Sequence, residues 1–197
     1  MAESLYLSLW FPDLEIEDLL PRALSVMRQF PFSPDRPGIT YLALHPVSWN
    51  EPTIFEQRFD PGVSPEHAVL LASDLLHADC AYAFEAAWDL WIYSEEQKQW
   101  VRKPAPVEFF VYGEEFEEGA YQQEGHIEAD FGFDSPFLQE DVQLTPETAH
   151  QVRANVQKLV EFTAKAEKSS GATSRLLWSE SEESLAQKLI ARLQEVQ

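Results

Sequence analysis

The hydrophobic pattern of the chain switches between two periods, and this switching limits the folds that it can adopt. Residues 4–11 alternate strictly, so every second side chain from Leu5 to Phe11 shares one face, as in a half-buried strand. Residues 15–30 repeat at helical spacing instead. Because proline is tolerated only in a first helical turn, Pro21 places the expected helix start near Asp18. A strand followed by a helix is therefore expected at the start of the chain.

The same analysis predicts four further elements before residue 94. They are a loop at 31–38, a β-hairpin formed by 39–47 and 53–59, a helix from Ser64 to about His77, and a strand at 80–93. The helix start is the best defined, because Ser64 is a good cap, Pro65 suits the first helical position and Glu66 faces the positive end of the helix dipole. Helix remains the alternative for 80–93, since this segment contains four alanines.

The resulting β-α-β-β-α-β order, over about residues 4–93, is the order of the ferredoxin-like split motif and predicts an α+β fold. Residues 94–144 predict antiparallel strands that extend the sheet, with Pro104 and Pro106 marking an irregularity or an edge. Residues 145–197 predict two C-terminal helices on either side of a polar linker at 169–174. A chain of 197 residues with this organisation is expected to form one domain.

The charge balance restricts the partners. The chain has 34 Asp and Glu against 14 Lys and Arg, which gives a net charge of −20. Such a charge repels phosphate backbones and anionic lipid headgroups, so neither nucleic acid nor a membrane is an expected partner. It attracts basic proteins, and it also keeps a protein soluble without any further role.

The N-terminal sequence and the cysteine content predict a cytoplasmic protein. Glu3 stands where a signal peptide needs basic residues, and the apolar run that follows ends at Pro12. No stretch approaches the roughly 20 apolar residues that cross a bilayer. A single cysteine, Cys80, excludes an intramolecular disulfide and a multi-cysteine metal site, which suits a reducing compartment.

One segment has the spacing of a ligand set. His126, Glu128 and Asp130 lie two residues apart and would project from one face of a strand, where they could bind a divalent metal or act as acids and bases. Simple alternation explains the same pattern, with Ile127 and Ala129 facing the core and the polar set facing water. We expect the solvated arrangement.

A second pair of carboxylates falls on the predicted strand 80–93. Glu85 and Asp89 share a face with Ala87 between them, and they could act as a general acid and base or hold a cation. Solvent exposure of both groups is the simpler alternative. Motifs for nucleotide binding, metalloprotease chemistry or a serine nucleophile are missing from the sequence, and we expect no cofactor.

The distribution of acids and aromatics supports the functional hypothesis. Residues 104–152 contain twelve acids and no Lys or Arg, which predicts an acidic lobe from Glu108 to Asp141. Aromatic residues concentrate in the middle of the chain, beside this segment, at Trp88, Trp91, Tyr93, Trp100, Phe109, Phe110 and Tyr112. The sequence therefore favours a non-enzymatic cytoplasmic binding protein that presents an acidic surface to a basic protein. The alternative is a metal-binding protein or a hydrolase-type enzyme that uses one of the two polar sets.

Overall fold

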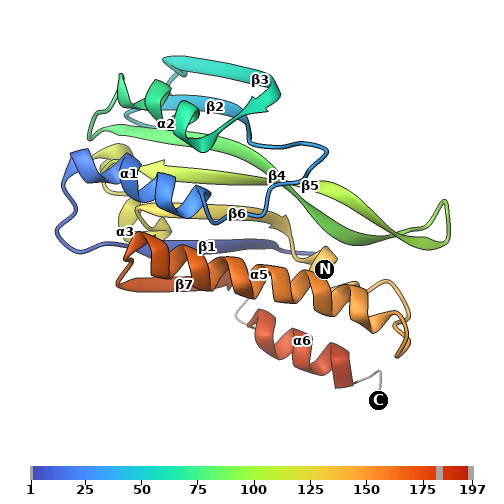
Figure 1. Ribbon diagram of the computed structural model, residues 1–197. Helices are drawn as coiled ribbons and strands as arrows, with labels where there is room; N and C mark the ends of the chain where they lie inside the picture. The colour runs from blue at the N-terminus through green and yellow to red at the C-terminus, as the bar shows by residue number, and fades with distance from the viewer. Residues whose placement is uncertain (1, 181–183, 195–197) are drawn as a thin grey trace.

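The computed structural model describes residues 2–180 and 184–194 and is built on one seven-stranded antiparallel sheet (Figure 1). The strand order is β3-β2-β4-β5-β6-β1-β7. The strands are β1 (Ser4–Trp10), β2 (Ile39–Pro46), β3 (Phe55–Val63), β4 (Cys80–Ser94), β5 (Gln99–Tyr112), β6 (Ile127–Phe133) and β7 (Ser174–Ser179). Every pair of neighbouring strands is antiparallel.

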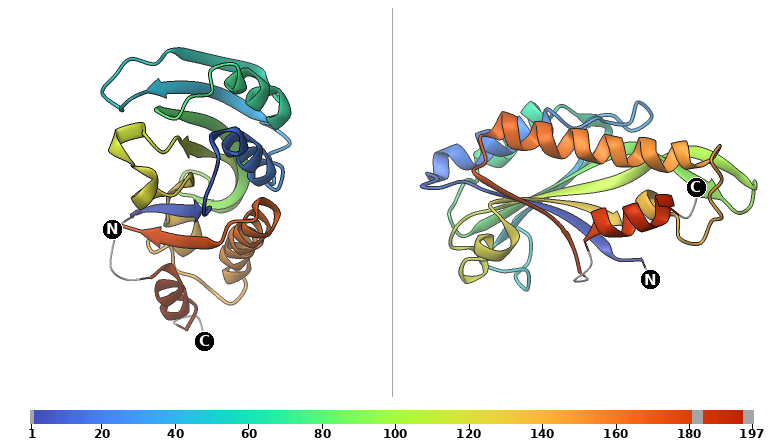
Figure 2. Two further views of the ribbon diagram at one scale, coloured as in Figure 1. Left: turned by 90° about the vertical axis from the view of Figure 1, so that its left-hand side faces the viewer. Right: turned by 90° about the horizontal axis from the view of Figure 1, so that it is seen from below.

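The helices divide unequally between the two faces of the sheet (Figure 2). They are α1 (Ile16–Met27), α2 (Pro65–Ser73), α3 (Tyr121–Glu124), α4 (Ser135–Leu138), α5 (Ala149–Ser170) and α6 (Leu185–Gln194), with a 3-10 turn η1 (Phe116–Glu118). The long helices α1 and α5 cover one face together with α2, whereas η1 and α3 lie against the opposite face, which we call the open face. The α+β class predicted from the sequence is confirmed.

The ferredoxin-like topology is not confirmed, because the strand order differs from that of a simple ferredoxin-like fold. In that motif the first strand lies inside the sheet formed by the other early strands. Here β1 pairs with β6 on one side and β7 on the other, while β4 pairs with β2 and β5. Both edges of β1 are therefore occupied by strands from the second half of the chain.

Most of the expected elements form close to their predicted positions. The β2–β3 hairpin and the strand at 80–94 are present, so the helix alternative for the latter is wrong. Ser64 caps α2, since its Oγ accepts a hydrogen bond from the backbone N–H of His67 at 3.2 Å. The helix ends at Ser73, one turn earlier than expected, and α1 begins at Ile16 with Pro21 inside it.

In the second half of the chain, β5 accommodates two prolines and β7 forms an additional strand. Strand β5 continues through Pro104 and Pro106 while pairing with β4, but β6 pairs only with residues 108–111 of β5. The prolines therefore lie where the second side of β5 is an edge, as one of the two sequence alternatives predicted. Strand β7 was not predicted, and it begins at the end of the segment expected to be a polar linker.

Alternation along the strands places the apolar side chains under the helices. Leu5, Leu7 and Leu9 of β1 are buried on that face, as predicted. Trp88 of β4 is fully buried and stacks on Phe131 of β6, with 5.3 Å between ring centroids. Phe162 of α5 packs edge-on against Trp88, with 6.3 Å between ring centroids, so the aromatic rings join the sheet to the helical layer.

Strand β2 pairs only with residues 80–85 of β4, and helix α5 covers the same edge of β4 farther along the strand. Asn155 is buried, and its side-chain amide accepts a hydrogen bond from the Trp91 N–H at 2.9 Å and donates one to the Trp91 carbonyl at 2.8 Å. It also donates to the Pro136 carbonyl at 2.7 Å. The amide thus pairs with the edge as a neighbouring strand would, and it protects that edge from pairing with another chain.

We expect Asn155→Ala to lower the free energy of unfolding by roughly 2–4 kcal/mol, because three backbone groups lose their partner inside the protein. Urea denaturation measures the change. Gln157→Ala, on the same helix, is the control, since Gln157 hydrogen-bonds only the exposed Glu161 and its loss is expected to cost less than about 0.5 kcal/mol. Equal losses in the two variants would show that Asn155 does not hold the edge of β4.

Candidate functional site

Three carboxylates lie side by side across the middle of the open face. The strand register pairs Glu85 of β4 with Glu108 of β5, and Glu108 with Asp130 of β6. We call these three residues the acid row. Neighbouring strands are about 4.8 Å apart, so the row places like charges next to one another. On one side of the row the register continues to Tyr6 of β1 and Trp178 of β7.

The acid row is partly withdrawn from water, and the pKa values reflect this. Burial raises the pKa of Glu108 above its ordinary value, and the charges of Asp130 and Glu85 raise it further. Burial also raises the pKa of Asp130, although a hydrogen bond from the backbone N–H of Gly132 lowers it in part. Ionising the whole row therefore costs free energy in the folded protein.

Glu128 lies next to the row and is more deeply buried. Its side chain on β6 is opposite Phe110, and its residue surface is only 5% exposed. The hydroxyl of Tyr112 donates a hydrogen bond to Oε1 at 3.1 Å, and a hydrogen bond with the carboxyl of Glu124 helps Glu128 to retain its proton. Burial raises the pKa of Glu128 to about 9, and the nearby carboxylate of Glu124 adds to the effect. Glu128 is therefore protonated at neutral pH.

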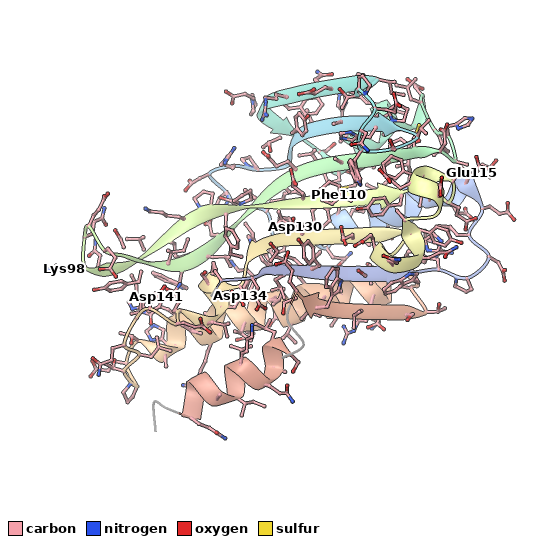
Figure 3. The ribbon with its side chains drawn as sticks, turned by 180° about the vertical axis from the view of Figure 1, so that it is seen from behind. Lys98, Phe110, Glu115, Asp130, Asp134 and Asp141 are labelled. Atoms are coloured by element: carbon pink, nitrogen blue, oxygen red, sulfur yellow. The ribbon has the colours of Figure 1, made fainter. Side chains whose placement is uncertain are left out.

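An open groove of about 740 Å³ borders Glu128 and Asp130. It lies among η1, α3 and the strands β1, β5, β6 and β7, and the described residues that line it include six carboxylates, five aromatic rings and no Lys, Arg or His. Figure 3 shows Phe110 and Asp130 on neighbouring strands of this face, with no long helix in front of them. At one side the rings of Tyr6 and Trp178 stack, with centroids 4.6 Å apart and an interplanar angle of 27°.

The sequence identified only part of this groove. Phe110 and Tyr112 belong to the aromatic segment that it singled out, and Glu128 and Asp130 to the polar set. Tyr6 and Trp178 were missed, although the alternation in residues 4–11 already placed Tyr6 on the face opposite the core. Trp178 carried no comparable signal, because its strand was not predicted.

The predicted acidic lobe is not one compact surface. Glu115 lies near one end of the sheet and Asp141 near the other (Figure 3). Asp134 is buried and is part of the scaffold: its Oδ2 lies 3.6 Å from Lys188 of α6, and its Oδ1 accepts a hydrogen bond from the Glu3 N–H. Only the part of the lobe from about 108 to 130 contributes to the acid row and the groove.

His126 is separated from Glu128 and Asp130 by its contacts. Its Nδ1 accepts a hydrogen bond from the Phe11 N–H at 3.2 Å, and its Nε2 lies 3.4 Å from Glu114 Oε1. Burial lowers the pKa of the imidazole. Both ring nitrogens are therefore engaged, and no group of three or more His, Cys, Asp or Glu side chains is arranged for a metal in the described part of the chain. The polar set is also mostly buried, so the expected solvated strand face is wrong for His126 and Glu128.

Glu85 and Asp89 have different partners. Glu85 Oε1 is hydrogen-bonded by the Thr40 hydroxyl at 2.8 Å, within the acid row. Asp89 Oδ2 lies 3.6 Å from the guanidinium of Arg102 on β5, and its buried Oδ1 has no hydrogen bond within the part of the chain that the structure describes. Residues four apart on a strand are separated by about 13 Å, so the backbone does not bring the two carboxyls to one substrate atom.

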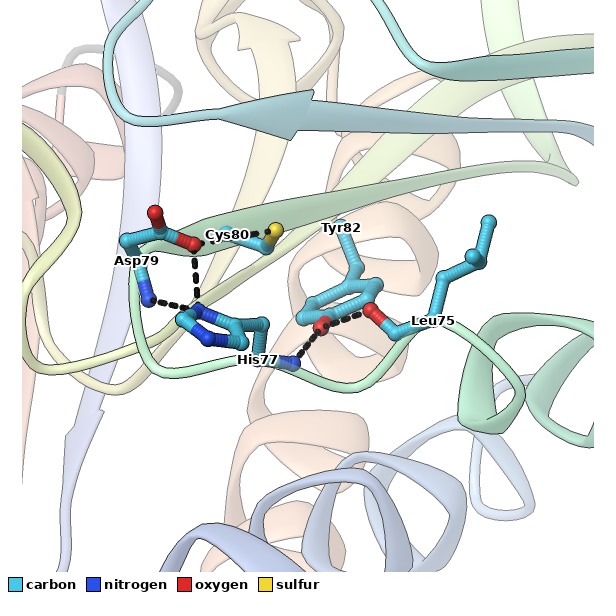
Figure 4. Close-up of polar contacts among 5 residues, drawn as sticks. All are labelled: Leu75, His77, Asp79, Cys80 and Tyr82. Atoms are coloured by element: carbon cyan, nitrogen blue, oxygen red, sulfur yellow. Dashed lines mark hydrogen bonds and ion pairs between the residues drawn. The ribbon is translucent and has the colours of Figure 1, made fainter.

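The only cysteine belongs to a polar cluster that closes the turn before β4 (Figure 4). Cys80 Sγ and His77 Nδ1 both contact Asp79 Oδ1, at 3.4 and 2.6 Å, and do not contact each other. Burial raises the pKa of the thiol to about 11, so it is not a nucleophile at neutral pH. The Tyr82 hydroxyl meanwhile bridges the Leu75 carbonyl and the His77 N–H, which makes the cluster a structural one.

No protein-family model, curated protein or solved structure matches this chain. Among the described helices, none combines the length and the apolar character that crossing a membrane requires. The groove and the acid row are therefore the features from which a function can be inferred.

The raised pKa of Glu128 makes the free energy of unfolding depend on pH. Its pKa is raised from 4.5 in the unfolded chain to about 9 in the folded protein, so between these values only the folded state binds this proton. Stability must then fall as pH rises through this window, by up to about 1.4 kcal/mol per pH unit. We expect urea denaturation between about pH 6 and pH 9 to show this decline in the wild type and a flatter profile in Glu128→Gln. If the free energy of unfolding still fell steeply with pH in Glu128→Gln, other groups would cause the decline. The exposed Glu95→Gln is the control, and it should keep the wild-type profile.

Repulsion within the acid row should lower the free energy of unfolding, and this leads to a separate prediction. Glu108→Gln removes the central charge of the row, so it should raise the free energy of unfolding by roughly 0.2–1 kcal/mol at neutral pH. Thermal and urea denaturation at low salt measure the gain, and added salt should diminish it. Glu95→Gln changes the net charge equally at the exposed β4–β5 turn, and a gain of the same size there would mean that the effect is not local.

Proposed function

We propose that this chain is a non-enzymatic binding protein whose open face recognises a basic protein. The observation that carries the proposal is the composition of the groove, whose described lining combines six carboxylates and five aromatic rings with no basic side chain. Carboxylates and aromatic faces both attract Lys and Arg side chains, the first by charge and the second by cation–π interaction. The acid row extends the same attraction across the neighbouring strands.

The properties of the whole chain agree with this proposal. A net charge of −20 accelerates the encounter with a basic protein and opposes binding to nucleic acid or to an anionic membrane. The proposal includes a cytoplasmic location, which the single buried thiol of Cys80 supports, because the folded chain requires no oxidising compartment.

The enzymatic and metal-binding alternatives have weaker support. A metal site at His126 would compete with the hydrogen bond from Phe11 and the contact with Glu114. An acid-base pair at Glu85 and Asp89 would need two carboxyls that the strand holds apart and that bind Thr40 and Arg102. The groove, by contrast, can accept a cation without breaking any of these contacts.

Binding of a fluorescent oligolysine peptide at low salt tests the proposal. We expect saturable binding that weakens steeply as salt is added. Glu108→Gln/Asp130→Asn should reduce the affinity by roughly tenfold or more, because it removes two charges beside the groove. Glu95→Gln/Glu96→Gln removes the same number of charges at the exposed β4–β5 turn and should change the affinity by less than about twofold.

Equal effects of the two double variants would show that the peptide responds only to net charge, and the proposed surface would then be wrong. Absence of binding at low salt would contradict the proposal as a whole. Metal-dependent binding or turnover lost in His126→Ala would instead favour the alternative functions.

A further inference from the structure

We propose that the outer edge of β7 binds an extended basic segment of the partner protein, which adds a further strand to the sheet with its basic side chains over the open face. This inference rests on the proposed function and names the form in which the basic partner is recognised. It is carried by the geometry of one sheet edge and by the side chains that surround that edge.

Strand β7 ends the sheet, and within the described chain it pairs with β1 alone. Seen from below, β7 lies in front of the sheet and α6 lies beyond the end of the strand, so no described helix crosses this edge (Figure 2). An edge strand presents N–H and C=O groups to which an extended segment of another protein can hydrogen-bond.

The direction of these backbone groups follows from the strand register. The carbonyl of Leu9 accepts a hydrogen bond at 2.9 Å from the residue directly before β6, so the backbone of Leu9 faces β6. Because backbone groups alternate between the two sides of a strand, the backbone of Ser8 faces β7, where it pairs with Leu176. The N–H and C=O groups of Leu176 therefore face β1. Those of Arg175 and Leu177 point outward.

The other free edges of the sheet are blocked against pairing. Strand β3, at the opposite end, contains Pro61 and several charged side chains, and its pairing with β2 includes a register shift. Pro104 and Pro106 lie on the free part of β5, and Asn155 covers the free part of β4. Charges, prolines, bulges and covering side chains are the usual protection of an edge strand.

Strand β7 lacks this protection. Its register with β1 is continuous and its sequence contains no proline. Its one charged side chain, Arg175, forms an ion pair with Glu167 of α5 at 3.1 Å. Leu176 is 51% exposed beside this edge. An open edge invites pairing with other chains, and a binding role accounts for its presence.

The surroundings of the edge favour a basic segment over a second copy of this chain. On the open face an added strand would lie beside Leu176 and Trp178, and Glu180 lines the groove together with Trp178. Lys and Arg suit this arrangement, because their aliphatic stems pack on apolar side chains while their charged ends reach a carboxylate. Two copies of the chain, each with a net charge of −20, would instead repel each other.

An antiparallel added strand, like every other pair in this sheet, fixes the positions of the charges. Residues of the segment that hydrogen-bond to Arg175 and Leu177 stand opposite them, with their side chains on the helix-covered face. The residues between them stand opposite Leu176 and Trp178, on the open face. The segment should therefore carry Lys or Arg at every second position, and the N–H groups of these basic residues should point away from β7.

Fluorescence titration at low salt with three peptides of equal charge tests the proposal. All three alternate lysine and threonine and are about as long as β7. One is unmodified, one is N-methylated at its threonines and one is N-methylated at its lysines, so each modification blocks one backbone edge of the peptide. We expect methylation of the threonines to lower the affinity by roughly tenfold or more, and methylation of the lysines to change it by less than about threefold.

Two variants at one position test the protein side of the same contact. Arg175→Pro removes an outward N–H group, whereas Arg175→Ala keeps it, and both lose the same charge and the ion pair with Glu167. We expect Arg175→Pro to bind the unmodified peptide roughly tenfold less tightly than Arg175→Ala, with urea denaturation to confirm that both variants fold.

Hydrogen exchange of the wild type gives a readout that needs no substitution. The N–H of Leu177 points outward, so its exchange should slow when the unmodified peptide binds. The N–H of Leu176 already faces β1, and its exchange should slow much less.

The outcomes distinguish strand addition from the proposed function. Equal binding of the two methylated peptides, or equal binding of the unmodified peptide by Arg175→Pro and Arg175→Ala, would overturn strand addition and leave the proposed basic-protein surface intact. Failure of every peptide to bind at low salt would overturn both. A wild-type dimer in sedimentation velocity that Arg175→Pro converts to a monomer would show that a second copy occupies the edge, and the basic segment would then be wrong.

Discussion

The antiparallel ladder between β4 and β5 is the interaction on which the rest of the structure depends. It runs without interruption from Ala81 opposite Tyr112 to Ser94 opposite Gln99. Side chains alternate along each strand, so this register places Trp88 in the core and Glu85 on the open face. A slip of one residue would exchange the two faces, burying the acid and exposing the tryptophan. Strands β2 and β6 continue the same register, and the acid row follows from the strand pairing rather than from any local motif.

The open face is poorly arranged for stability. Like charges stand opposite one another in the acid row, and Glu128 is buried beside a second carboxyl, that of Glu124. The core on the helix-covered face offsets these costs, since it contains the stacked pair of Trp88 and Phe131 and the leucines of β1. Departures from local rules that a strong core tolerates are typical of surfaces with a function. The same reasoning separates Asp134 from Glu128. Burial of Asp134 is matched by Lys188, whereas no cation of the described residues acts on the pKa of Glu128.

Local chemistry made the elements predictable, and long-range pairing did not. Alternation identified the strand at 4–10, and the cap at Ser64 identified the start of α2. The strand order was not accessible, because β1 pairs with β6 and β7 more than a hundred residues away, and nothing in the sequence of β1 selects these partners. The burial of Glu128 was missed for a related reason. Alternation predicted the correct face of β6 for its side chain. The packing of η1 and α3 over that face depends on tertiary structure, which local sequence patterns do not predict.

The protonated state of Glu128 bears directly on what the groove can recognise. A neutral ligand leaves the carboxyl protonated and gains no attraction to its charge. A cation changes the protonation state, and the attraction between the two charges then acts in a partly buried site where water screens it less. The carboxyl must first lose its proton, which opposes binding more strongly at low pH and less as pH approaches about 9. Affinity for a cation should therefore rise with pH across the same range in which the free protein loses stability, because one proton governs both equilibria.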